Sequence, residues 1–150
     1  MSDNVTPFRR PKPVRPQQSG GFGFKTHRGK VLLGHLLTLA AFSANFFLRM
    51  PPYSLIGLVI AIAAVVIVYS NRGEAMPWAN THHEHALRTL MFGYAIWVLA
   101  SLLTYVHGSL ITITFYVQLG VLIWAVLRAS VALVLGVMRK PVPNPRGWLF

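Results

Sequence analysis

The feature that most limits how this chain can fold is a succession of long apolar runs without a single acidic residue. The runs lie at about 31–49, 53–70, 87–106 and 115–138, and short polar or proline-containing stretches separate them. A helix needs about 20 apolar residues to cross a bilayer, whereas a soluble core shows shorter runs at helical or strand period. We therefore expect an all-α integral membrane protein, a bundle of four spanning helices at these positions.

The first run carries a stripe of polar residues. His35, Thr38, Asn45 and Arg49 recur at offsets that place all of them on one helix face. In a membrane such a face should contact protein rather than lipid. The sequence Met50-Pro51-Pro52 follows, and it ends the helix because proline cannot continue one.

Small residues predict close helix packing in the second and fourth runs. They are Gly57 and Ala61 in the second run, and Ala125, Ala129, Ala132 and Gly136 at helical spacing in the fourth. Side chains of this size let a neighbouring backbone approach closely. The apolar stretch from Leu110 to Met138 is too long for one upright span, so it is either tilted or its first turn stands outside the hydrocarbon.

The entry to the third run concentrates polar residues. Thr81-His82-His83-Glu84 has the pattern of a capping box, which predicts a helix start near His82. His82 and His85 are three residues apart and could face one ion, and imidazole with carboxylate suits zinc, nickel or copper. A pH-sensitive cluster formed by His82, His83, Glu84 and His85 is a second functional interpretation. The structural alternative is a polar helix start at the lipid headgroups, with no cofactor at all.

Arg128 lies well inside the fourth run. It is roughly ten residues, or about 15 Å of helix, from the basic end of that run. An arginine near the bilayer centre costs about 2.5 kcal/mol or more and normally faces the bundle. No run contains a carboxylate, so the expected partners are Asn45, hydroxyls, carbonyls or the ring of Trp124. We adopt a structural contact; a functional contact with an anion or a partner subunit is the alternative.

Basic residues dominate the charge of the chain. Lys and Arg number 14 against three Asp and Glu, which gives a net charge of +11. Residues 1–30 are rich in proline and glycine, and we expect a disordered tail there. Its basic residues should contact anionic headgroups of the bilayer rather than nucleic acid; they are Arg9, Arg10, Lys12, Arg15, Lys25, Arg28 and Lys30. The positive-inside rule places this tail, the histidine loop and the short tail 139–150 in the cytoplasm.

The absence of carboxylates from the runs also limits function. Proton- or cation-coupled transporters usually keep an acidic residue in a span. The chain has no cysteine, no G-x-S-x-G, no H-E-x-x-H and no phosphate-binding loop, so we do not expect an enzyme. We expect a structural, assembly or accessory protein that acts through helix contacts in a homo-oligomer or a larger membrane complex. A small transporter or channel subunit is the first alternative, and a metal- or haem-linked membrane protein the second.

Three segments follow patterns that occur together in one family. They are Gly34-His35-Leu36, Ala86-Leu87 and the stretch from Gly136 to Pro145. With four spans and both tails inside, the chain resembles a bacterial four-span family of unknown function, remotely similar to the membrane component of the chloroplast inner-envelope protein import machinery. The resemblance covers about 30–150 and implies a fold and the bacterial inner membrane rather than an activity. The chain departs at Arg88, where the family usually has Asn, and at Pro-Val-Pro-Asn-Pro, which replaces a tyrosine-proline element.

Overall fold

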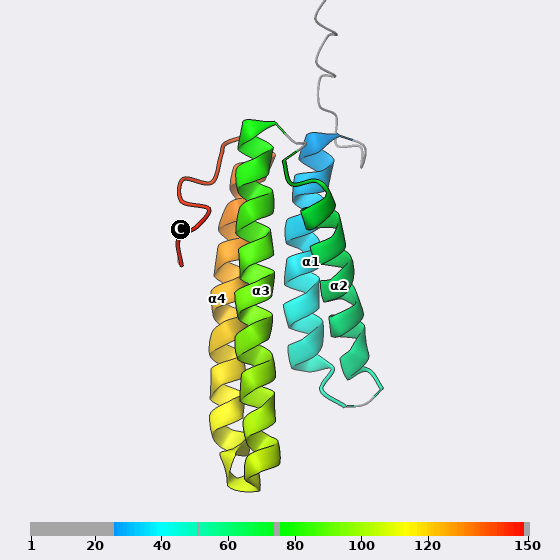
Figure 1. Ribbon diagram of the computed structural model, residues 1–150, viewed down its shortest axis with the longest axis vertical. Coiled ribbons are helices and arrows are strands. Elements are labelled where there is room, and N and C mark those ends of the chain that lie inside the picture. The colour runs from blue at the N-terminus through cyan, green and yellow to red at the C-terminus, as the bar shows by residue number, and fades with distance from the viewer. Residues whose placement is uncertain (1–25, 51, 74–75, 149–150) are drawn as a thin grey trace, which may run out of the picture.

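The described part of the chain is an antiparallel bundle of four α-helices. The computed structural model describes residues 26–50, 52–73 and 76–148, and it places no strand among them. The helices are α1 (His27–Phe47), α2 (Ser54–Ser70), α3 (Pro77–Val106) and α4 (Ile111–Val137), with a 3₁₀ turn at Gly108–Leu110 (Figure 1). α1 packs on both α2 and α4, and α3 packs mainly on α4. Three helices are long and apolar enough to cross a membrane: α1, α3, and α4 together with the 3₁₀ turn that precedes it. The fourth, α2, is apolar but shorter.

The bundle consists of two hairpins of unequal length. α1 and α2 have 21 and 17 residues, and α3 and α4 have 30 and 27. At a rise of 1.5 Å per residue, the first pair is about 31 and 26 Å long and the second about 45 and 40 Å. The α3–α4 hairpin therefore extends past the turn between α1 and α2 (Figure 1).

The first helix begins earlier than the hydrophobic pattern predicts. Thr26 is its N-cap, and the Thr26 hydroxyl accepts a hydrogen bond from the Gly29 N–H at 3.1 Å. Two basic residues that we expected in the tail, Arg28 and Lys30, thus belong to the first turn of α1. Arg28 donates to the carbonyl of Val137 at 2.7 Å, and Lys30 donates to Asn71 Oδ1 at 2.6 Å.

These two bonds tie the start of α1 to the ends of α4 and α2, which is a different role from the expected contact with headgroups. Residues 1–25 of the predicted tail lie outside the described part of the chain. They include the other basic residues assigned to headgroup contact: Arg9, Arg10, Lys12, Arg15 and Lys25.

The predicted capping box at the start of the third helix is wrong. α3 begins at Pro77, four residues before Thr81, because proline at the first helical position has a suitable φ and needs no N–H partner. The Thr81 hydroxyl donates to the carbonyl of Trp78 at 2.7 Å, inside the helix. Glu84 does not turn back to cap the helix; it accepts a hydrogen bond from Arg88 at 2.8 Å.

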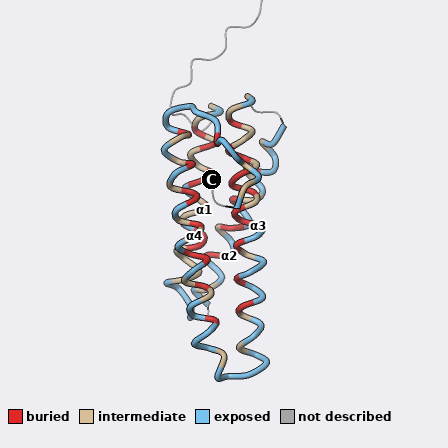
Figure 2. Tube along the Cα trace, turned by 90° about the vertical axis from the view of Figure 1, so that its left-hand side faces the viewer, coloured by how far each residue is buried: buried red, intermediate tan, exposed pale blue. Residues whose placement is uncertain are grey.

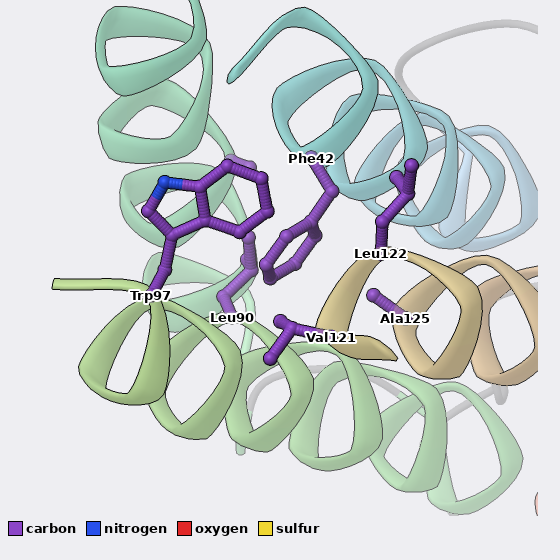
Figure 3. Packing of buried hydrophobic residues seen from close by; sticks show 7 residues of the cluster. Phe42, Leu90, Trp97, Val121, Leu122 and Ala125 are labelled. Atoms are coloured by element: carbon purple, nitrogen blue, oxygen red, sulfur yellow. The ribbon is translucent and has the colours of Figure 1, made fainter. Parts of the chain in front are cut away.

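The apolar core lies where α1, α3 and α4 meet. Phe42 of α1 is fully buried and packs among Leu90, Trp97, Val121 and Leu122, with Ala64 and Ala125 completing the cluster (Figure 3). Buried positions follow the inward sides of the helices, and the outer sides are exposed (Figure 2). Those exposed sides are largely apolar, as expected of helices that face lipid.

The small residues lie at helix contacts, as the spacing indicates. Gly57, Ala61, Ala125, Ala129, Ala132 and Gly136 are all buried. A Cβ atom at Gly57 would lie 2.5 Å from Asn45 Cγ and 2.7 Å from the Asn45 backbone nitrogen, so α1 and α2 touch almost backbone to backbone there. A Cβ atom at Gly136 would lie 3.0 Å from a methyl group of Val31, which brings α4 against α1.

Candidate functional site

Histidine and arginine side chains converge inside the bundle, near the end where α1 and α3 begin. We call the set formed by His35, His82, His85, Thr89 and Arg128 the histidine–arginine centre. Each of these residues is 1% exposed. Positions 82, 85 and 89 are three and four residues apart, which puts them on one face of α3, turned toward α1 and α4.

His82 is held by a hydrogen bond at each ring nitrogen. Its Nε2 lies 2.8 Å from the carbonyl oxygen of Lys140, which can only accept, so Nε2 carries the proton. In the neutral ring Nδ1 is then the acceptor, and His35 Nε2 donates to it at 3.1 Å. The two rings meet edge to face, with centroids 5.3 Å apart. These bonds fix the tautomers of both histidines.

Arg128 connects the centre to the C-terminal segment. Its Nε donates to the Thr89 hydroxyl at 3.1 Å, and one terminal nitrogen donates to the Gly147 carbonyl at 2.7 Å. The other terminal nitrogen lies 3.1 Å from His85 Nδ1, which must accept because arginine has only donors. The guanidinium also lies over the Trp124 ring, 5.2 Å from its centroid. Asn45, the remaining expected partner, is instead bonded to Tyr94.

Three buried imidazole nitrogens have no hydrogen-bond partner among the described residues: His35 Nδ1, His83 Nε2 and His85 Nε2. Buried polar atoms are normally satisfied, so each of these requires an explanation. The tautomers derived from the hydrogen bonds make His35 Nδ1 an acceptor and His85 Nε2 a donor. Their rings are 6.2 Å apart between centroids. The centre therefore offers both an acceptor and a donor to a small polar guest or to a proton.

The residues predicted to bind metal do not form one group. Glu84 points to arginines: its Oε1 lies 2.8 Å from Arg88 Nε, and its Oε2 lies 3.6 Å from Arg72. Only His82 and His85 of the predicted set belong to the histidine–arginine centre. Within residues 26–50, 52–73 and 76–148, no three His, Asp or Glu side chains are arranged to hold a metal ion.

The predicted polar stripe of α1 divides into separate sites. Thr38 is buried and donates to the Gly34 carbonyl at 2.8 Å. Asn45, one helical turn after Phe42, donates to the Tyr94 hydroxyl, and that hydroxyl donates to the Gly57 carbonyl at 3.1 Å. This chain of bonds joins α1, α2 and α3 far from the histidines.

Arg49 is the exception to the predicted stripe, and its placement there is wrong. It is exposed and follows the end of α1 at Phe47, so helical spacing no longer applies to it. Its guanidinium lies over the rings of Phe46 and Phe115, with centroids 4.5 and 4.9 Å away. These contacts are at the opposite end of α1 from His35.

The C-terminal segment after α4, which the sequence predicts only as a short tail, packs against α3 and α4 and closes the centre. The Val142 N–H donates to the Thr81 hydroxyl at 3.0 Å, and Trp124 Nε1 donates to the Trp148 carbonyl at 2.8 Å. The rings of Phe92 and Trp148 lie 4.9 Å apart between centroids.

Sequence reasoning missed this segment as a source of carbonyl acceptors. It also missed Thr89, which the spacing of four residues from His85 could have revealed.

No family model, curated protein or solved structure matches this chain. The site is therefore interpreted from its own geometry.

Proposed function

We propose that this chain is a four-span integral membrane protein that acts as a structural, assembly or accessory subunit through helix contacts. Three helices are long enough to span, and α2, at 17 residues, consists of apolar residues between Ser54 and Ser70. The outer faces of α2, α3 and α4 are apolar over most of their length. Such faces suit lipid or the helix of another membrane protein.

The observation that carries this proposal is that the interior polar residues bond to one another instead of lining an open path. His35 and Arg128, which a water-filled route through the bundle would expose, are each 1% exposed. Arg128 binds Thr89, His85 and Gly147, and Asn45 binds Tyr94. A buried network of this kind favours a scaffold over a conduit.

The arrangement of charge supports a location with both termini in the cytoplasm. Seven basic residues lie toward the end of the bundle where α1 and α3 begin: Arg28, Lys30, Arg72, Arg88, Arg139, Lys140 and Arg146. Among the described residues the opposite end has Arg49 as its single Lys or Arg. By the positive-inside rule the first of these ends faces the cytoplasm. The bacterial inner membrane is part of the proposal because the family that the chain resembles occupies it.

Photo-crosslinking from the outer helix faces tests the proposal. A photoreactive residue replaces Val59, which is 64% exposed on α2, or Ile123 on the outer face of α4. The control position is Ala64, which is fully buried on α2. We expect an adduct with one defined protein from an outer position and none from Ala64. Adducts with lipid alone from both outer positions would contradict a scaffold that acts through helix contacts.

One observation favours a small transporter or channel subunit as the second candidate. The partnerless nitrogens of His35 and His85 could pass a proton between the buried rings. Reconstitution in vesicles with a pH-sensitive dye distinguishes the two candidates. Proton flux that is lost in His35→Leu would support the transporter and contradict a purely structural role.

A further inference from the structure

A cavity of about 50 Å³ lies beside the histidine–arginine centre, between α3, α4 and the C-terminal segment. Its lining residues are Arg88, Phe92, Trp124, Arg128, Arg146, Gly147 and Trp148. Since a water molecule occupies about 30 Å³, the space suits one or two waters or a single tetrahedral oxyanion. The cavity is distinct from the buried histidines, and only Arg128 belongs to both.

Three guanidinium groups from three separate elements border this small cavity. Arg88 comes from α3, Arg128 from α4 and Arg146 from the C-terminal segment. Glu84 binds Arg88 through Nε alone, which leaves both terminal nitrogens of Arg88 without a bond to a described residue. Arg146 makes no hydrogen bond or ion pair within the described part of the chain. Like charges gathered in this way attract an anion.

The third guanidinium, that of Arg128, is held in place before any ligand arrives. Thr89, His85 and the Gly147 carbonyl fix its orientation, and the Trp124 ring supports its face. A fixed guanidinium loses little conformational freedom on binding, and its positive charge adds to that of Arg88 and Arg146 at the cavity. The bond from Arg128 to the Gly147 carbonyl also holds the segment that carries Arg146. The same contact therefore shapes the cavity and brings Arg146 to its edge.

The position of the cavity indicates where the anion comes from. The C-terminal segment is not helical, and lipid-exposed backbone without regular hydrogen bonds is excluded from the hydrocarbon region. This part of α3 and α4 must therefore stand at the level of the headgroups. Phe92 and Trp148, which are 41% and 64% exposed, flank the cavity, and aromatic side chains are typical of that interfacial layer.

We propose that this cavity binds a phosphate group, held by Arg88, Arg128 and Arg146. The phosphate of a phospholipid headgroup and inorganic phosphate share this chemistry. The cavity wall is rich in aromatic rings, and the headgroup layer is adjacent, so a lipid phosphate is the source that reaches the site without crossing bulk water.

Tryptophan fluorescence tests the proposal, because Trp124 and Trp148 line the cavity. Delipidated protein in mild detergent is titrated with short-chain phosphatidylglycerol, with inorganic phosphate, and with chloride at matched ionic strength. We expect a saturable change with phosphatidylglycerol. Arg88→Gln and Arg146→Gln should each weaken this binding about tenfold, the scale of one charged hydrogen bond. Native mass spectrometry of the same samples counts retained lipid independently of fluorescence.

The matched control is Arg72→Gln. Arg72 lies at the same end of the bundle and contacts the same Glu84, but it does not border the cavity. We expect its binding curve to match that of the unmodified chain. Saturation with phosphatidylglycerol alone supports a headgroup site, and saturation with inorganic phosphate as well supports a general phosphate site. Binding by neither probe, or equal weakening in Arg72→Gln, would overturn the proposal.

Discussion

Replacing Arg128 with leucine separates a structural arginine from one that is merely tolerated in the membrane. The change removes the hydrogen bonds to the Thr89 hydroxyl, His85 Nδ1 and the Gly147 carbonyl. It leaves His85 with no partner at either ring nitrogen, because Nε2 has none among the described residues already. It also detaches the C-terminal segment at Gly147.

The expected net cost is about 1 kcal/mol. Polar contacts between membrane helices are worth about 0.6 kcal/mol on average and at most about 1.7 kcal/mol. Two of the bonds, to Thr89 and His85, are of this kind, and the third, to the Gly147 carbonyl, contributes on the order of 1 kcal/mol. Removing the charge also removes its free-energy cost in the membrane, which is about 2.5 kcal/mol at the bilayer centre and less near the headgroups. The bonds exceed this cost only because Arg128 lies at the level where the non-helical C-terminal segment packs.

Thermal unfolding in detergent and trypsin cleavage after Arg146 measure the two consequences. The variant should unfold at a lower temperature, and the C-terminal segment should be cut faster. Lys140→Leu is the matched control, since it removes an exposed charge of the same sign but leaves the Lys140 carbonyl that His82 binds. An Arg128→Leu protein that is more heat-stable, with cleavage no faster than the control, would refute a structural role for Arg128.

Three further changes follow from the same contacts. Gly57→Ala should destabilise the bundle by about 1–3 kcal/mol, because the added Cβ would lie 2.7 Å from the Asn45 backbone nitrogen. Gly120→Ala is the control for the same melting experiment. No atom lies within 4 Å of a Cβ at position 120, so this change should be neutral or stabilising. Thr81→Val should cost about 1 kcal/mol and speed trypsin cleavage of the C-terminal segment, since the Val142 N–H loses its acceptor; unchanged cleavage would contradict this. The chain has no cysteine, so single Arg72→Cys and Ser109→Cys variants can report topology through labelling with an impermeant maleimide. We expect Ser109→Cys to react in intact cells and Arg72→Cys not to react. The same result for both variants would exclude the four-span arrangement.

Much of the helical framework could be predicted from the sequence, because apolar length and small-residue spacing are local properties. The helix ends were less predictable. Thr26 and Pro77 start α1 and α3 earlier than the hydrophobic runs suggest, since caps and prolines act before the apolar pattern begins. The capping-box pattern at Thr81 failed because Glu84 has an arginine four residues later and a second one, Arg72, across the loop.

The candidate site was predictable only in part. The spacing of His82 and His85 indicates a shared face, and His35 and Arg128 were expected to face the interior. No periodicity indicates that the proline-containing segment after Val137 folds back, because its bonds are made by backbone carbonyls of Lys140 and Gly147. Backbone acceptors carry no signal in residue identity, so their positions emerge only from the structure.

The unequal hairpins place hydrophobic mismatch on one side of the molecule in the proposed four-span arrangement. A hydrocarbon layer about 30 Å thick matches α1 and exceeds the 17 residues of α2 by several ångströms. α3 is about 15 Å longer than this layer, but its polar first turns lie outside the hydrocarbon, and its apolar run 87–106 matches the layer. Lipids beside α2 are then drawn thinner, at a fraction of a kcal/mol per Å, while those beside α3 need no such adjustment. A bilayer that is locally thin on the α2 side would accommodate the protein at the lowest cost.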